Sequence, residues 1–189
     1  MARTTSDEAE SGRYVLAGSA SHLLHRAEQL AAECFAELSQ NGLTLRQFAV
    51  LAAIADEPGL SQSALVRVTG IDRSTLADMM SRMKERGLVT RTASATDARA
   101  LSIELSQDGA AMLRAMDKHA RAADAAVLDL LTKPKRRAFL ATLVKLSKLA
   151  DERASRLERD AKRQAKREAK RQKRAESGDG KHKGRRKHG

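Results

Sequence analysis

The chain has 189 residues, of which 41% are hydrophobic but only 2% aromatic, and this composition predicts a core of Leu, Ala, Val and Met packed between helices. Its one cysteine, Cys34, excludes an intramolecular disulfide and a zinc site built from cysteines. Most of the formal net charge of +12 lies in residues 151–189, which hold 16 Lys and Arg against 7 Asp and Glu, so the rest of the chain is only mildly basic.

Residues 1–12 are polar and acidic, which predicts a disordered lead without the apolar stretch of a signal peptide. No apolar run approaches the roughly 20 residues that cross a bilayer, so we expect a cytoplasmic protein with no membrane partner. From Tyr14 to Leu38, apolar residues recur at steps of three and four, and this spacing predicts one long amphipathic helix. Gly42 is expected to follow its end in the left-handed conformation.

A second helix is predicted to begin at Thr44, because Thr44 and Gln47 have the spacing of a capping box, and to end before Pro58. Its expected buried stripe consists of Phe48, Leu51, Ala52 and Ala55. Two shorter helices follow, joined by a turn at Gly70, with Ser61 and Asp72 as their expected N-caps. The second of these is expected to bury Leu76, Met79, Met80 and Met83.

The next segment predicts a hairpin, because residues 88–91 and 99–105 have strand patterns and the residues between them are polar. Ser106 is expected to cap a fifth helix, and a sixth begins after Thr132. The expected buried face of the sixth helix consists of Phe139, Leu143, Leu146 and Ala150. Further along, a repeated Ala-Lys-Arg-Gln/Glu unit favours helix with little to bury, and residues 177–189 are expected to be disordered.

Two short helices around a glycine turn, followed by a hairpin, are the order of elements in a winged helix-turn-helix. In this arrangement Arg73 to Thr75, at the start of the second short helix, approach base edges in the DNA major groove. Arg82 and Lys84 lie further along, where phosphate contact and a plain solvent-facing role are almost equally favoured. On the hairpin, Arg91 and Arg99 are placed to reach the adjacent minor groove.

Residues 43–109 resemble the MarR family of bacterial transcriptional regulators, and with the flanking helices the resemblance covers residues 14–150. It depends on the order and spacing of short motifs and is strongest from Asp72 to Gly109. The matching residues are Leu43–Thr44, Gln47, Val50–Leu51, Pro58–Gly59, Ser61–Gln62, Leu65, Ile71–Thr75, Gly87–Val89, Arg91, Asp97–Arg99, Leu105–Ser106 and Gly109.

The resemblance implies a mainly α-helical fold with a small β-hairpin wing, which dimerises through its N- and C-terminal helices and binds a palindromic operator in double-stranded DNA. It also implies a regulator, most often a repressor, that responds to a small aromatic or phenolic effector. The implied segments are a lead (1–12), an N-terminal dimerisation helix (13–42), a winged helix-turn-helix domain (43–105), C-terminal dimerisation helices (106–153) and a basic low-complexity tail (154–189).

In the family wing motif Asp-x-Arg, matched here by Asp97 and Arg99, the Asp helps to fix the Arg that enters the minor groove. This chain departs from the family at Ala98, often a second arginine, and at Ala95, often proline. The expected DNA-binding residues are Ser61, Gln62, Ser63, Arg73, Ser74, Thr75, Asp78, Arg82, Arg91, Asp97 and Arg99.

Several alternatives stay open. Cys34 lies on the apolar stripe of the first long helix, which favours an inert buried thiol over a peroxide sensor. His22 and His25 share a helix face but lack a third metal ligand in sequence, so no metal or cofactor is expected and contact with a small ligand is an option. The basic tail is either a nonspecific DNA-binding arm or a solubilising extension. A weakly specific, nucleoid-associated protein is the second hypothesis, and the lack of any catalytic signature argues against an enzyme.

Overall fold

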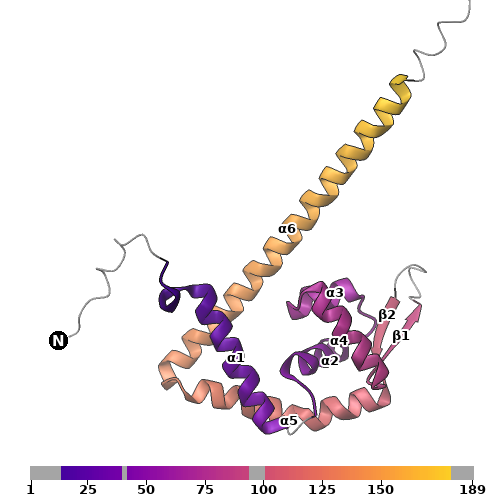
Figure 1. Ribbon diagram of the computed structural model, residues 1–189. Helices are drawn as coiled ribbons and strands as arrows, with labels where there is room; N and C mark the ends of the chain where they lie inside the picture. The colour runs from indigo at the N-terminus through magenta and orange to yellow at the C-terminus, as the bar shows by residue number, and fades with distance from the viewer. Residues whose placement is uncertain (1–13, 40–41, 94–100, 180–189) are drawn as a thin grey trace, which may run out of the picture. The chain divides into compact units, whose positions relative to one another are not determined.

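The computed structural model describes residues 14–39, 42–93 and 101–179, and the chain divides into two compact units, 1–132 and 133–189 (Figure 1). The first unit carries the helices and the hairpin of a winged helix, and the described part of the second is a single helix. In chain order the elements are η1 (Leu16–Gly18), α1 (Ala20–Ser39), α2 (Leu45–Asp56), α3 (Gln62–Thr69), α4 (Arg73–Glu85), β1 (Val89–Ala93), β2 (Leu101–Leu105), α5 (Gln107–Asp129) and α6 (Lys133–Asp179).

The start of α1 differs from the sequence prediction, whereas its end at Ser39 agrees with it. The helix starts at Ala20 rather than Tyr14, because Ser19 is extended and its hydroxyl accepts the N–H of His22 at 3.4 Å, after the 3₁₀ turn η1. After the end of α1, Gly42 lies close to α5, where a Cβ would be 2.9 Å from the flexible end of the Met116 side chain.

The predicted N-caps are confirmed, and they explain where four helices begin. Thr44 and Gln47 form a full capping box, with the N–H of Thr44 donating to the Gln47 side chain at 3.0 Å and the N–H of Gln47 donating to the Thr44 hydroxyl at 3.2 Å. Ser61, Asp72 and Ser106 cap α3, α4 and α5 in the same way, each accepting a backbone N–H three residues on.

The buried stripe of α2 is wider than predicted and is rotated. Leu51 is buried as expected, but Phe48 and Ala52 are half-buried and Ala55 is exposed. The reason is that α2 packs against α3, β2 and α5 at once, so more than one face is enclosed. The residues of α2 that are buried are Val50, Leu51, Ala53 and Ile54.

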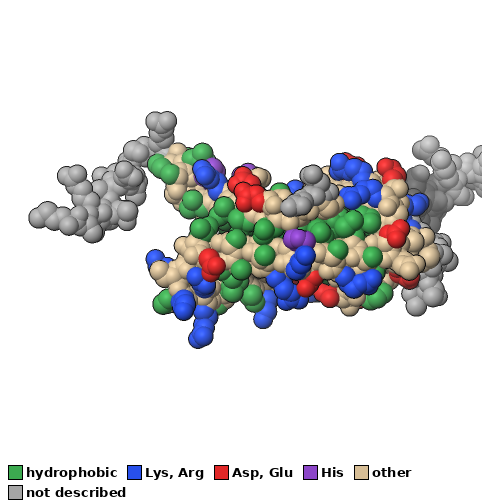
Figure 2. Space-filling view, turned by 90° about the horizontal axis from the view of Figure 1, so that it is seen from below, with side chains coloured by type: hydrophobic (Ala, Val, Ile, Leu, Met, Phe, Trp, Pro, Cys, Tyr) green, Lys and Arg blue, Asp and Glu red, His purple; other side chains and the backbone are tan. Residues whose placement is uncertain are grey.

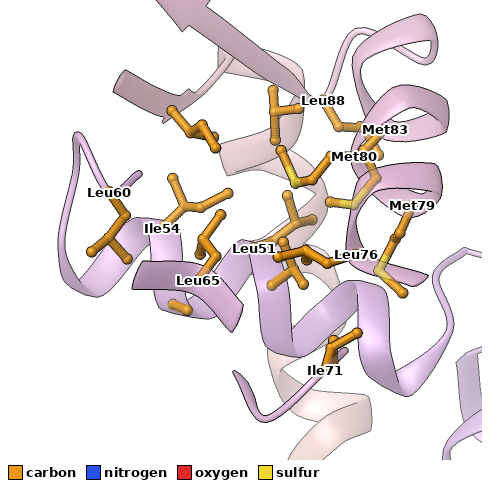
Figure 3. Packing of buried hydrophobic residues seen from close by; sticks show 14 of the residues in the cluster. Leu51, Ile54, Leu60, Leu65, Ile71, Leu76, Met79, Met80, Met83 and Leu88 are labelled. Atoms are coloured by element: carbon orange, nitrogen blue, oxygen red, sulfur yellow. The ribbon is translucent and has the colours of Figure 1, made fainter. Parts of the chain in front are cut away.

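The main core fills the space between α2, α3, α4 and the hairpin. Figure 3 shows Leu51 of α2 directed toward Leu76 and Met80 of α4, with Leu88 at one side of the cluster. All four α4 residues predicted to face inward are buried, and they are Leu76, Met79, Met80 and Met83. This packing fixes which face of α4 is left for solvent.

The hairpin pairs β1 with β2 antiparallel, from Val89 opposite Leu105 to Ala93 opposite Leu101. A third short pairing was not predicted: the N–H of Ile103 donates to the Leu60 carbonyl at 3.1 Å, just before α3. The wing is therefore hydrogen-bonded to the chain that enters the helix-turn-helix.

The hairpin is also tied to the start of α5. The N–H of Ser106 donates to the Leu88 carbonyl at 3.1 Å, and its hydroxyl donates to the carbonyl of Gly87. A Cβ on Gly109 would lie 1.9 Å from the Leu88 carbonyl oxygen, so only glycine fits there. The wing and α5 thus meet backbone to backbone.

The second unit, α6, begins with Pro134 in its first turn, as predicted, and continues without a break to Asp179. The helix therefore does not end near residue 153, where the composition changes and the basic tail was predicted to begin. Residues 177–179, which were expected to be disordered, are also helical. Helix-forming residues at nearly every position account for this continuity. Within the described part of the chain, every helix is too short or too polar to cross a membrane.

Candidate DNA-binding surface

The turn between α3 and α4 sets the direction of the second helix. Gly70 adopts φ 68° at the end of α3 and donates its N–H to the Val66 carbonyl at 3.0 Å. The Thr69 hydroxyl donates to the Leu65 carbonyl at 2.6 Å, which closes the last turn of α3. The left-handed residue at this position is the helix stop predicted for a glycine.

The exposed face of α4 lies opposite its Leu and Met core residues. At 3.6 residues per turn, Ser74, Asp78 and Glu85 point away from the core, and all three are exposed. Arg82 lies on the edge of this face, where its Nε donates to the Asp78 carbonyl at 3.4 Å. The face is polar and carries charges of both signs.

The start of α4 is organised by Asp72. One carboxylate oxygen accepts the Ser74 hydroxyl at 2.6 Å and the N–H of Thr75 at 2.9 Å. The hydrogen bond from the Ser74 side chain, followed by those from Thr75, holds the pKa of Asp72 well below its ordinary value. The Thr75 N–H is therefore occupied by the cap, while the Ser74 oxygen can still accept a hydrogen bond.

The predicted residues divide into three groups in the structure. Arg73, Ser74 and Asp78 are exposed on α4, and Thr75 is half-buried. At the start of α3, the Ser61 hydroxyl is engaged as the N-cap, Gln62 is half-buried and Ser63 is exposed. On β1, Arg91 is half-buried opposite Ile103. The wing residues Asp97 and Arg99 lie outside the described residues.

One residue of the α4 face was missed by the sequence reasoning. Ser81 is exposed and its hydroxyl hydrogen-bonds Glu85 at 3.2 Å. It lies seven positions after Ser74, and this two-turn spacing is the signal that places both on one face. With Ser74, Asp78 and Arg82, it completes a strip of hydrogen-bonding groups along α4.

The winged domain is coupled to α1 and α5 through aromatic packing. The rings of Phe35 on α1 and Phe48 on α2 lie 5.6 Å apart at 45°. Phe35 is buried in a second cluster with Ala120 and Ala123 of α5, and Phe48 packs against this cluster and the main core. A shift of α1 relative to α5 would therefore press on α2.

A groove of about 380 Å³ lies beside this contact, between α1, α2 and the α3–α4 turn. Its wall includes Glu28 of α1 and Arg46 of α2, whose Nε lies 3.0 Å from a Glu28 carboxylate oxygen. His25 lies 3.9 Å from the other oxygen of Glu28. Ile71 and Asp72 form the far wall, so the groove adjoins the cap of α4.

The exposure of Cys34, His22 and His25 bears on the peroxide-sensor, metal-site and small-ligand alternatives. Cys34 is half-buried rather than fully buried and packs against the Phe35 cluster. His22 is half-buried and His25 exposed. Within the described ranges, no three His, Cys, Asp or Glu side chains gather as metal ligands would.

Known proteins match this chain over its helical and winged parts. The MarR family profile matches residues 41–100. The HTH-type transcriptional repressor Rv2887 of Mycobacterium tuberculosis is 36% identical over 126 residues, which make up 66% of this chain and 91% of that protein. A solved structure of Rv2887 in complex with salicylic acid has a TM-score of 0.54 at 32% identity, covering 68% of this chain and 96% of that one.

Two further structures are similar. BpsR of Bordetella bronchiseptica, whose DNA binding is regulated by 6-hydroxynicotinic acid, has a TM-score of 0.65 at 30% identity over 72% of this chain and 98% of its own. The repressor CouR bound to a 23-mer DNA duplex has a TM-score of 0.62 at 29% identity over 70% of this chain and 94% of its own. On its sequence and its winged-helix fold, the chain belongs to the MarR family of transcriptional regulators.

Proposed function

We propose that the chain is a ligand-responsive repressor that binds a palindromic operator as a homodimer in the cytoplasm. The observation that carries this proposal is the division of α4 into a buried Leu and Met face and an exposed strip of Ser, Asp and Arg side chains. Such a helix, following a short first helix and a tight turn, fits the major groove.

Each proposed contact follows from side-chain chemistry. Arg73 donates to guanine acceptors, Asp78 accepts from cytosine N4, and Ser74 and Thr75 hydrogen-bond either kind of base edge. The remaining predicted residues are assigned to the DNA backbone and the minor groove. They are Ser61, Gln62, Ser63 and Arg82 for phosphates, and Arg91, Asp97 and Arg99 for the wing.

The dimer proposal is supported by apolar side chains that one copy leaves exposed, visible as green surface in Figure 2. On α1, Leu23 and Leu24 are each 51% exposed. On α6, considered by itself, the exposed apolar residues are Leu140, Leu143, Val144, Leu146 and Leu149. Burying such side chains against a second copy gains about 25 cal/mol per Å² of apolar surface.

The effector is proposed to be a small aromatic acid that binds the groove between α1 and α2. Arg46 supplies a cation for the carboxylate, and Leu45 and Ile71 supply apolar walls. The acid would compete with Glu28 for Arg46, which loosens the α1–α2 contact. The Phe35–Phe48 packing then passes the change to the winged domain, so the spacing of two recognition helices alters.

The proposal is tested by selecting an operator from a random duplex library and footprinting it. We expect one protected palindrome, and loss of that footprint in the Arg73→Ala, Ser74→Ala double variant. Arg121→Ala is the matched control, because Arg121 is an exposed cation on α5 outside the proposed surface. Uniform protection without a preferred palindrome would instead support the nucleoid-associated alternative and contradict the proposal.

A further inference from the structure

The outer part of α6, defined here as residues 153–171 and named the basic arm, carries its positive charge on one side. At about 100° per residue, all of its cations fall within about half of the helix circumference. Every one of them is exposed. They are Arg153, Arg156, Arg159, Lys162, Arg163, Lys166, Arg167, Lys170 and Arg171.

The other half of the basic arm is small or acidic. Ala161 and Ala165 lie there, together with two of the three acidic residues, Glu158 and Glu168. The third, Asp160, lies at the edge of the basic half. Among the described side chains, none of the nine cations forms a salt bridge. No described side chain therefore neutralises their charge.

The dimensions and chemistry of the basic arm suit duplex DNA. Its length is about 27 Å, and its cations follow one another at steps of one or three residues, while a duplex carries one negative charge per about 1.7 Å of axis. A membrane surface would require a broad apolar face opposite the cations. Here that face holds alanines, glutamates and one large apolar residue, Leu157.

We propose that the basic arm binds the phosphate backbone of double-stranded DNA beside the operator, without reading its sequence. This inference rests on the proposed function, because the winged domain holds the DNA and the covalent link raises the effective concentration of that DNA around the arm. The matches to the relatives described above span 91% or more of each relative but at most 72% of this chain. This chain therefore carries sequence that those relatives lack.

The test compares the wild-type protein with two full-length variants. The first removes four cations by Lys162→Gln, Arg163→Gln, Lys166→Gln and Arg167→Gln. The second keeps composition and net charge but moves two lysines to the other half by Ala161→Lys, Lys162→Ala, Ala165→Lys and Lys166→Ala. All replacements are good helix formers, and circular dichroism verifies equal helix content.

Binding to a scrambled duplex and to the selected operator duplex is measured between about 50 and 200 mM salt. The four-glutamine variant should bind the scrambled duplex about tenfold or more weakly at low salt, with a log–log salt slope reduced by up to about 3.6 per arm. The rearranged variant should lose about half of that slope, since two of the four cations have left the basic half.

An unchanged slope in the four-glutamine variant would overturn the proposal. A rearranged variant that matches the wild type would also overturn it, because net charge rather than arrangement would then suffice. Arm-dependent binding that prefers single-stranded RNA to the scrambled duplex would reassign the partner and sink the DNA proposal. A failure of the proposed function would give a different result. The wild type would then bind the operator and scrambled duplexes with equal affinity, whether or not the arm variants changed the salt slope.

Discussion

The winged-helix domain and the basic arm reach helical structure by opposite routes. In the domain, α4 is held by buried Leu and Met side chains from one face and by the Asp72 cap at its start. In the arm, nearly every side chain is exposed, and only intrinsic helix preference acts. The domain can therefore hold a few side chains in fixed positions, whereas the arm can offer only a pattern of charge. This difference suits base recognition in the first case and backbone contact in the second.

The largest expected difference between the two regions is in stability. Leu65→Ala should lower the free energy of unfolding by about 2–5 kcal/mol, because Leu65 of α3 is fully buried in the main core. Leu157→Ala, the matched change in the arm at a residue 60% exposed, should cost far less. Urea denaturation at one fixed protein concentration measures both, and equal losses would contradict the comparison.

The second prediction separates base reading from backbone binding. Arg73→Ala should weaken operator binding by about 1–3 kcal/mol while leaving affinity for a scrambled duplex nearly unchanged. Neutralising the arm should instead weaken both duplexes and flatten the salt dependence. Titration of fluorescent duplexes measures these affinities, and an Arg73→Ala variant that loses both affinities equally would make Arg73 a phosphate contact.

The third prediction concerns the loss of folding stability at low pH, to which Asp72 of the winged-helix domain contributes. The folded pKa of Asp72 is lowered by the Ser74 and Thr75 hydrogen bonds, so its contribution to stability is present above its ordinary pKa near 3.8 and is lost as the pH falls below it. Asp72→Asn keeps an acceptor for the cap but removes this titration. The melting temperature of the variant should therefore fall less between about pH 6 and pH 3 than that of the wild type. An identical fall in both proteins would show that Asp72 does not contribute.

The smallest expected effect on stability is at the Glu28–Arg46 pair. This pair is exposed, so Arg46→Gln should change the free energy of unfolding by less than about 1 kcal/mol. The same variant should lose the rise in melting temperature that salicylic acid is expected to give the wild type. Thermal melting with and without salicylic acid measures this, with Arg121→Ala as the control. A full salicylic acid response in Arg46→Gln would place the effector elsewhere.

Local signals in the sequence were sufficient for much of the fold. The caps at Thr44, Ser61 and Ser106 were predictable because the interaction spans only three residues. The inward face of α4 followed from its spacing for the same reason. Most residues of the exposed strip along α4 were also predicted, and Ser81 could have been added from its two-turn distance to Ser74.

Contacts between residues that are far apart in the sequence could not be predicted from local patterns. The pairing of Leu60 with Ile103 joins segments that no local pattern connects. The wider burial of α2 also depends on three partners arriving together. For α6, helix was predicted in the repeat, but residues 154–189 were assigned to a separate tail and 177–179 to disorder, so the unbroken length of the helix was missed. The roles of Asp97 and Arg99 stay predictions.

We propose that exposed side chains of α4, Arg73 and Ser74 among them, supply sequence recognition while the basic arm supplies nonspecific affinity. The most direct measurement is the ratio of operator to scrambled-duplex affinity for the Arg73→Ala, Ser74→Ala variant, across a salt series. We expect this ratio to fall toward one in the variant while the salt slope stays at the wild-type value. A variant that keeps the wild-type ratio would contradict the role of Arg73 and Ser74 in sequence recognition.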